Sequence, residues 1–151
     1  MDINELRNRA EQHYRSGRLP DALDAYTRLC KQTPGDAQAW HMQAAISGML
    51  GQYQQTADCC ERAIALAPGA ASIYTNYASA LIELSRHNDA LDALEKALEL
   101  NPADTNTQTL LGRLHLLMEN QTRAAAAFRE AFRSAPDNAE AASSLARLLL
   151  D

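Results

Sequence analysis

Four prolines stand at equal intervals along the chain. Pro34, Pro68, Pro102 and Pro136 follow one another at a spacing of 34 residues, and Pro20 lies outside the series. A fixed period of this length is typical of a chain built from stacked copies of one short structural unit. Proline cannot continue a helix because it lacks the amide hydrogen that the helical ladder uses. The spacing therefore predicts units of 34 residues, each closed by a proline.

Shifting the sequence by this period brings side chains of matching size into register. Small residues, which would let two helices cross closely, dominate three aligned columns, and larger side chains that would fill the remaining space form a fourth. The first three columns are Ala10, Ala44, Ala78 and Gly112, then Ala22, Thr56, Ala90 and Ala124, then Leu29, Ala63, Ala97 and Ala131; the bulky column is Tyr26, Cys60, Leu94 and Phe128. This alternation predicts two tightly packed helices in each unit.

The pattern resembles the tetratricopeptide repeat family over about residues 3–150. The aromatic residue that the family places early in the first helix is matched by Trp40 and Tyr74, and its Leu-Gly pair by Leu111 and Gly112. Leu6 and Gln108 take the aromatic column in the outer repeats. The resemblance implies an all-α fold, a right-handed α-α superhelix of four helix-turn-helix repeats with one additional C-terminal helix.

We expect a single domain over residues 1–151, with repeats at about 3–36, 37–70, 71–104 and 105–138 and a terminal helix at 139–150. The predicted first helices are 3–16, 37–50, 71–84 and 105–118, and the second helices are 20–32, 54–66, 88–100 and 122–134. Asp36, Asp104 and Asn138 follow their prolines by two residues, where each can cap the next helix. The third unit opens without such a residue, and His87 is expected in a turn.

Composition excludes several classes of partner. The formal charge of −5 and the absence of clustered Lys and Arg argue against nucleic acid, which is bound by neutralising its phosphates. Charged residues near the N-terminus do not fit a signal peptide, and no window is apolar over the length of a membrane span. We therefore expect a cytoplasmic protein that contacts neither nucleic acid nor membrane.

No motif for catalysis, cofactor binding or metal binding is present, so we expect no enzyme activity, no cofactor and no metal site. The three cysteines are an odd number, and Cys59 and Cys60 are neighbours, which disfavours a structural disulfide; small buried hydrophobes are the simplest interpretation. His13 and His115 share a column facing the partner helix and are expected to pack there. His41 projects toward the expected groove, where ligand contact and plain solvation remain equally open.

In the family that the sequence resembles, the first helices line a concave groove that holds a segment of another protein. Carried over column by column, this implies a groove with apolar anchors and orienting amides and hydroxyls. The implied groove residues are Arg7, Glu11, Tyr14, Gln38, His41, Met42, Met49, Thr75, Asn76, Ser79, Ile82, Asn106, Thr109, Leu110 and Arg113. No lysine lies on a first helix, which disfavours the lysine-rich clamp by which some relatives hold acidic chaperone tails.

The sequence thus favours a non-catalytic scaffold that binds a peptide or protein segment. Two alternatives stay open: a targeting module of a larger bacterial enzyme such as a glycosyltransferase or sulfotransferase, and a small secretion-type chaperone. The terminal helix contributes a further question, because it is rich in leucine. Leu145, Leu148, Leu149 and Leu150 either cover the fourth repeat, or mark a missing fifth repeat, or form a homodimer contact.

Overall fold

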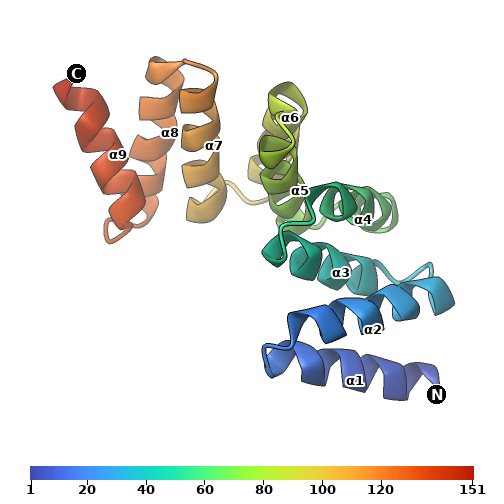
Figure 1. The fold of residues 1–151 in the computed structure, drawn as a ribbon. Helices are drawn as coiled ribbons and strands as arrows, with labels where there is room; N and C mark the ends of the chain where they lie inside the picture. The colour runs from blue at the N-terminus through green and yellow to red at the C-terminus, as the bar shows by residue number, and fades with distance from the viewer.

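The computed structural model describes residues 1–151 and contains nine α-helices and no strands. Figure 1 shows them as one continuous curved array with the two termini at opposite ends. The helix direction turns along the array, so that α7, α8 and α9 stand nearly upright in the view in which α1, α2 and α3 lie across it. The helices are α1 (Ile3–Arg15), α2 (Leu19–Gln32), α3 (Ala37–Met49), α4 (Tyr53–Leu66), α5 (Ala71–Glu83), α6 (His87–Leu100), α7 (Thr105–Leu117), α8 (Gln121–Ser134) and α9 (Ala139–Leu150).

Every predicted helix is present, and each begins and ends within one residue of its predicted position. The expectation for His87 is corrected, because this residue is the first of α6 and does not belong to the turn. The turns before α6 and α8 contain no glycine, and Ser85 and Glu119 take the left-handed conformation there, each with φ of 59°. Gly17 and Gly51 fill the same role in the first two repeats, where glycine adopts this conformation without steric cost.

Side-chain caps begin the first helices of most repeats. Asp36, Asp104 and Asn138 each accept a hydrogen bond from a backbone N–H of the first turn, and Asp2 and Glu5 form a reciprocal capping box on α1. Such a cap contributes about 1 kcal/mol by satisfying an orphan donor. Only α5 lacks one among these five helices, because Ala70 occupies its N-cap position.

Trp40, Tyr74 and Gln108 occupy the same column of three successive repeats, and each donates a side-chain hydrogen bond to the backbone. Trp40 Nε1 donates to the carbonyl of Pro34 at 3.0 Å, and Tyr74 Oη donates to the carbonyl of Pro68 at 2.9 Å. Gln108, which departs from the aromatic pattern, makes the equivalent bond to the carbonyl of Pro102 at 2.7 Å. The substitution therefore keeps the hydrogen bond that ties the start of each first helix to the proline before it.

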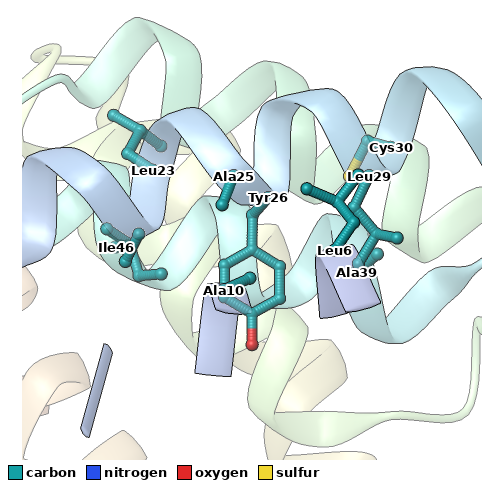
Figure 2. Packing of buried hydrophobic residues seen from close by; sticks show 10 residues of the cluster. Leu6, Ala10, Leu23, Ala25, Tyr26, Leu29, Cys30, Ala39 and Ile46 are labelled. Atoms are coloured by element: carbon teal, nitrogen blue, oxygen red, sulfur yellow. The ribbon is translucent and has the colours of Figure 1, made fainter. Parts of the chain in front are cut away.

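The core follows the predicted columns. All four members of each of the four columns are buried. Figure 2 shows the arrangement in the first repeat, where Ala10 lies beside the ring of Tyr26. Small residues thus permit close helix crossings, and one larger side chain fills the space in each unit.

One junction between successive helices is packed less extensively than the others. Among consecutive helices, α6 and α7 pack against each other least extensively.

At the C-terminus, α9 packs against α8 through Ala141, with Leu145 and Leu148 partly buried against Phe128 and its neighbours. Leu149 and Leu150 do not cover the fourth repeat, since they are 66% and 87% exposed.

Candidate functional site

A cavity of 370 Å³ lies between the C-terminal halves of α3 and α5 and the middle of α7. It is bordered at one end by Tyr53 and Thr56 from the start of α4. Since α3, α5 and α7 are the first helices of successive repeats, the cavity lies on the face for which the sequence implies a groove. Six of the implied groove residues line it, namely Met49, Asn76, Ser79, Ile82, Leu110 and Arg113.

The lining combines small residues with long apolar side chains. Ala44, Ala45, Gly48 and Ala80 contribute little volume, whereas Met49, Ile82 and Leu110 are long apolar side chains that surround the space. Met49 is 58% exposed, so its flexible thioether side chain is free to adapt to a bound group. The cavity is therefore suited to a large apolar group of a ligand.

Sequence reasoning missed Gly48, Tyr53 and Thr56 as lining residues. Tyr53 and Thr56 belong to a second helix, whereas the resemblance implies a groove lined by the first helices. The signal for Gly48 is in the sequence, because its column carries Tyr14, Ile82 and Leu116 in the other repeats. A single glycine in a column of large side chains indicates a hollow.

The remaining implied residues lie outside this cavity, and several of them join one repeat to the next. In the column of Arg7, His41, Thr75 and Thr109, every member is hydrogen-bonded to the next first helix, to α9 or to the N-cap residue of one of these helices. The partners are Asp36 at 2.7 Å from Arg7, Asn76 at 3.1 Å from His41, Thr107 at 2.8 Å from Thr75 and Asn138 at 3.2 Å from Thr109. This column forms a series of polar contacts that links the first helices along the whole array.

Other implied residues are not brought together by the fold. Tyr14 and Met42 are partly buried against the core of the first repeat. Gln38 and Asn106 are exposed at the starts of α3 and α7, and Glu11 lies 4.0 Å from Arg15 on α1. The implied groove residues that share a cavity therefore lie in the middle of the array, on α3, α5 and α7, and not along its full length.

Burial affects the chemistry of His41 in the centre of this face. Removal from water lowers the pKa of His41 below 6.5, which favours the neutral ring. The amide nitrogen of Asn76 can only donate, so Nε2 of His41 accepts and the ring carries its proton on Nδ1. The pair is thus arranged for a neutral histidine.

The charges near the cavity are unevenly compensated. Arg113 forms an ion pair with Glu140 of α9, with Nε 3.5 Å from Oε1. On α1, away from the cavity, Arg7 is paired with Asp36 and Arg15 is paired with Glu11. Glu83, which also lines the cavity, has no cationic side chain within ion-pair distance. The uncompensated charge at the cavity is therefore negative.

The cysteines and the remaining histidines lie away from the cavity. Burial raises the pKa of Cys30 and Cys60 to about 12 and that of Cys59 to about 11, and all three thiols are free. His115 is 6% exposed, and its pKa is lowered by burial and by Arg123. No group of three His, Cys, Asp or Glu side chains is arranged to hold a metal ion, and none of the nine helices has the length and apolar character to cross a membrane.

Comparison with solved structures shows the same fold in several proteins. MamA (41-end) from Desulfovibrio magneticus RS-1 matches with a TM-score of 0.91 and 20% identity, covering 98% of this chain and 84% of that one. YrrB, described as a repeat protein of this class with an unusual peptide-binding site, matches with a TM-score of 0.82 and 20% identity, covering 99% and 77%. The first such domain of Spaghetti (RPAP3), bound to the HSP90 peptide SRMEEVD, matches with a TM-score of 0.73 and 21% identity, covering 76% and 90%.

At these identities the similarity extends to the fold. A comparison with curated proteins gives no match. Three family models described as tetratricopeptide repeat match residues 3–46, 49–114 and 109–151, so that together they span nearly the whole chain. These matches agree with the helix pairs, the small-residue columns and the prolines that close each unit: the chain belongs to the tetratricopeptide repeat family.

Proposed function

We propose that this protein is a non-catalytic scaffold that binds a segment of another protein on the face formed by α1, α3, α5 and α7. The observation that carries the proposal is the cavity of 370 Å³ to which three successive first helices contribute. Cavities of this size that combine an apolar lining with a few polar groups are the usual form of a binding site. Two proteins of the same fold are described with peptides or peptide-binding sites, which supports a peptide ligand here.

The polar groups around the cavity suit a peptide backbone. Asn76 and Ser79 line it with an amide and a hydroxyl, which can pair with main-chain groups whatever side chains the ligand carries. The same groups are held on helices, and the first helices are linked to one another through the column of Arg7, His41, Thr75 and Thr109. These hydrogen bonds hold neighbouring first helices in register before the ligand arrives, which reduces the entropy lost on binding.

Site-specific photocrosslinking tests the proposal. A benzoylphenylalanine residue would be introduced at Ser79, which is exposed at the cavity, and separately at Asp92, which is exposed on α6. In cells that express the full chain, we expect the Ser79 probe to capture a protein partner through a defined segment and the Asp92 probe to capture it much less. Equal capture by both probes, or capture by Asp92 alone, would place the partner on another surface.

We further propose that two copies of the chain associate through α9. Leu149 and Leu150 are exposed, and Ala146, which continues the column of Ala44 and Gly112, is also exposed. Because the equivalent face of the other first helices is covered by a second helix, α9 presents an uncovered apolar strip. Sedimentation is expected to show dimers that increase with concentration and are reduced by Leu149→Glu; a monomer at all accessible concentrations would contradict this.

The proposed compartment is the cytoplasm. Three buried cysteines are unpaired, which fits a reducing environment in which thiols persist.

A further inference from the structure

The glycine of α3, Gly48, is required neither by the backbone conformation nor by close packing. Gly48 lies near the end of the helix, and the same column of the other repeats carries Tyr14, Ile82 and Leu116. Its φ is not in the left-handed region, which only Gly17 and Gly51 adopt among the glycines. A Cβ built on Gly48 would meet only the side chain of Thr56, at 3.6 and 3.7 Å, which is ordinary contact.

Glycine inside a helix is less favourable than alanine by about 1 kcal/mol. Gly112 has a packing reason, because a Cβ there would lie 2.7 Å from the Phe128 ring. No side chain packs as closely on Gly48. The absence of a side chain at this position therefore leaves open space beside the helix. That space is the cavity of 370 Å³, whose small lining residues are Ala44, Ala45, Gly48 and Ala80.

The size and lining of the cavity define what can occupy it. Water molecules that occupy this volume lie against apolar side chains such as Met49, Ile82 and Leu110, from which their release is favourable. A large apolar side chain such as Phe or Leu would displace them and fill the hollow that Gly48 leaves.

The charges at the rim select what lies next to that side chain. Glu83 lines the cavity and has no ion-pair partner, whereas the guanidinium of Arg113 is already paired with Glu140 at 3.5 Å. A cation beside the apolar group would therefore gain a partner, and an anion would meet an unpaired carboxylate.

We propose that this cavity is an anchor pocket for a protein segment with one large apolar side chain adjacent to a lysine or arginine, and that Gly48 keeps the pocket open. The inference rests on the proposed function, because it concerns the same face. It adds the chemistry of the ligand and identifies Gly48 as the residue that sets the depth of the pocket.

The test uses four synthetic peptides of equal length on a common Gly, Ser and Asn background, with Phe-Lys, Phe-Glu, Ala-Lys or Ala-Glu at the centre. Each is titrated into the isotope-labelled full chain, and binding is followed through the backbone amide resonances. We expect the Phe-Lys peptide to shift Gly48, Ala80 and Ile82 and to bind at least tenfold more tightly than the Phe-Glu and Ala-Lys peptides.

Two variants at one position separate pocket filling from helix stability. Gly48→Leu reproduces the side chain that Leu116 places in this column and should reduce Phe-Lys binding at least tenfold. Gly48→Ala adds only the methyl group for which there is room, so it should raise the melting temperature and keep most of the binding. Circular dichroism confirms that both variants fold.

The outcomes distinguish this inference from the proposed function. If the peptides shift first-helix resonances without preference for Phe-Lys, or if Gly48→Leu binds as the natural chain does, the pocket assignment is overturned while the groove remains. If no peptide shifts any resonance of α1, α3, α5 or α7, the anchor pocket is overturned, and the proposed function is then decided by the crosslinking at Ser79 and Asp92.

Discussion

The aromatic ring of Phe128 packs so closely on Gly112 that a Cβ atom at residue 112 would lie 2.7 Å from Cε1 of the ring. Phe128 is the largest fully buried side chain of the protein. In the third repeat the equivalent pair is Ala78 with the smaller Leu94, and both are buried completely. In the first repeat an aromatic ring, that of Tyr26, lies beside Ala10, so a ring in this column does not by itself require glycine. At Gly112 the ring of Phe128 takes the place that a Cβ atom would need.

This relationship predicts the effect of Gly112→Ala. Alanine favours the helix by about 1 kcal/mol, but its methyl group would overlap the ring, and overpacking of a core typically costs 1–3 kcal/mol. Because the ring is fully buried and cannot move into solvent, we expect a net loss of stability of about 1 kcal/mol. Urea unfolding followed by circular dichroism measures it.

The matched control replaces the ring as well. Gly112→Ala combined with Phe128→Leu recreates the pair Ala78 and Leu94, so the double variant should be more stable than the sum of the two single changes predicts. Additive effects of the two substitutions, or a Gly112→Ala variant as stable as the natural chain, would contradict the packing relationship.

Ala78→Leu is predicted to destabilise the third repeat. Ala78 is 0% exposed and packs beside Leu94 and Leu114, so the added side chain has no free space. The expected loss is about 1–3 kcal/mol through overpacking. Thermal melting provides the measurement, with Glu95→Leu on the exposed surface of α6 as the control. Equal melting temperatures for Ala78→Leu and the natural chain would show that the helices can separate there without loss.

Stability should fall as the pH is lowered below 6.5. Burial lowers the pKa of His41, and burial together with Arg123 lowers that of His115, from the ordinary value of 6.5. Between this value and the lowered pKa values the unfolded chain binds more protons than the folded one, so acid favours unfolding. The contribution is complete above pH 6.5 and is lost as the pH falls through the lowered pKa values. Urea midpoints from pH 8 to pH 5 measure it.

A double variant checks the assignment to these two residues. His41→Gln with His115→Gln removes both titrating rings, and it should flatten the dependence of the urea midpoint on pH across this range, whatever its absolute stability. A slope equal to that of the natural chain would assign the effect to other groups.

The three thiols should react only when the chain opens. Burial raises their pKa values to between about 11 and about 12, and only the thiolate is nucleophilic. At pH 8 we expect disulfide reagents to modify the folded protein at least about 100-fold more slowly than the protein in urea. Ser143→Cys adds a thiol on the exposed surface of α9 and should react at an ordinary rate. Rapid reaction of the natural chain would mean that the cysteines are accessible.

Asn76→Ala should weaken binding of a partner captured at the cavity. The amide lines the cavity and contacts His41, so its loss leaves a ligand group unpaired, at a cost of about 1–3 kcal/mol. Because Asn76 and His41 are both only partly buried, water can replace the lost hydrogen bond, and we expect little change in melting temperature. Calorimetry against the captured segment measures the affinity, with Asp92→Ala as the outer-face control. Equal affinities for both variants would move the binding surface away from this face.

Helix positions and the buried columns were predictable from the sequence because they depend on local rules. A proline closes each unit, a small residue marks each close crossing, and the period repeats both. Gln108 shows the limit of such matching. By residue type it breaks the aromatic column, yet its amide reaches the carbonyl of Pro102 as Trp40 reaches that of Pro34.

The candidate site was less predictable, because it depends on contacts between repeats. The column of Arg7, His41, Thr75 and Thr109 was predicted to line the groove, and its hydrogen bonds to the next first helix, to α9 or to their N-cap residues were not predicted. Which side chain each one reaches is set by the turn of one repeat on another, and the period does not specify that angle. The cavity at Gly48 depends likewise on a missing side chain and on two residues of α4.

The weak packing between α6 and α7 has a consequence for how the array opens. A linear stack separates most readily at its weakest junction, so thermal fluctuations should divide this molecule into a block of six helices and a block of three. Leu110 and Arg113 belong to the shorter block, and the rest of the cavity belongs to the longer one. A bound segment would therefore fasten the two blocks together, and occupancy would be felt as far away as α9, in slower exchange of its amide hydrogens with water.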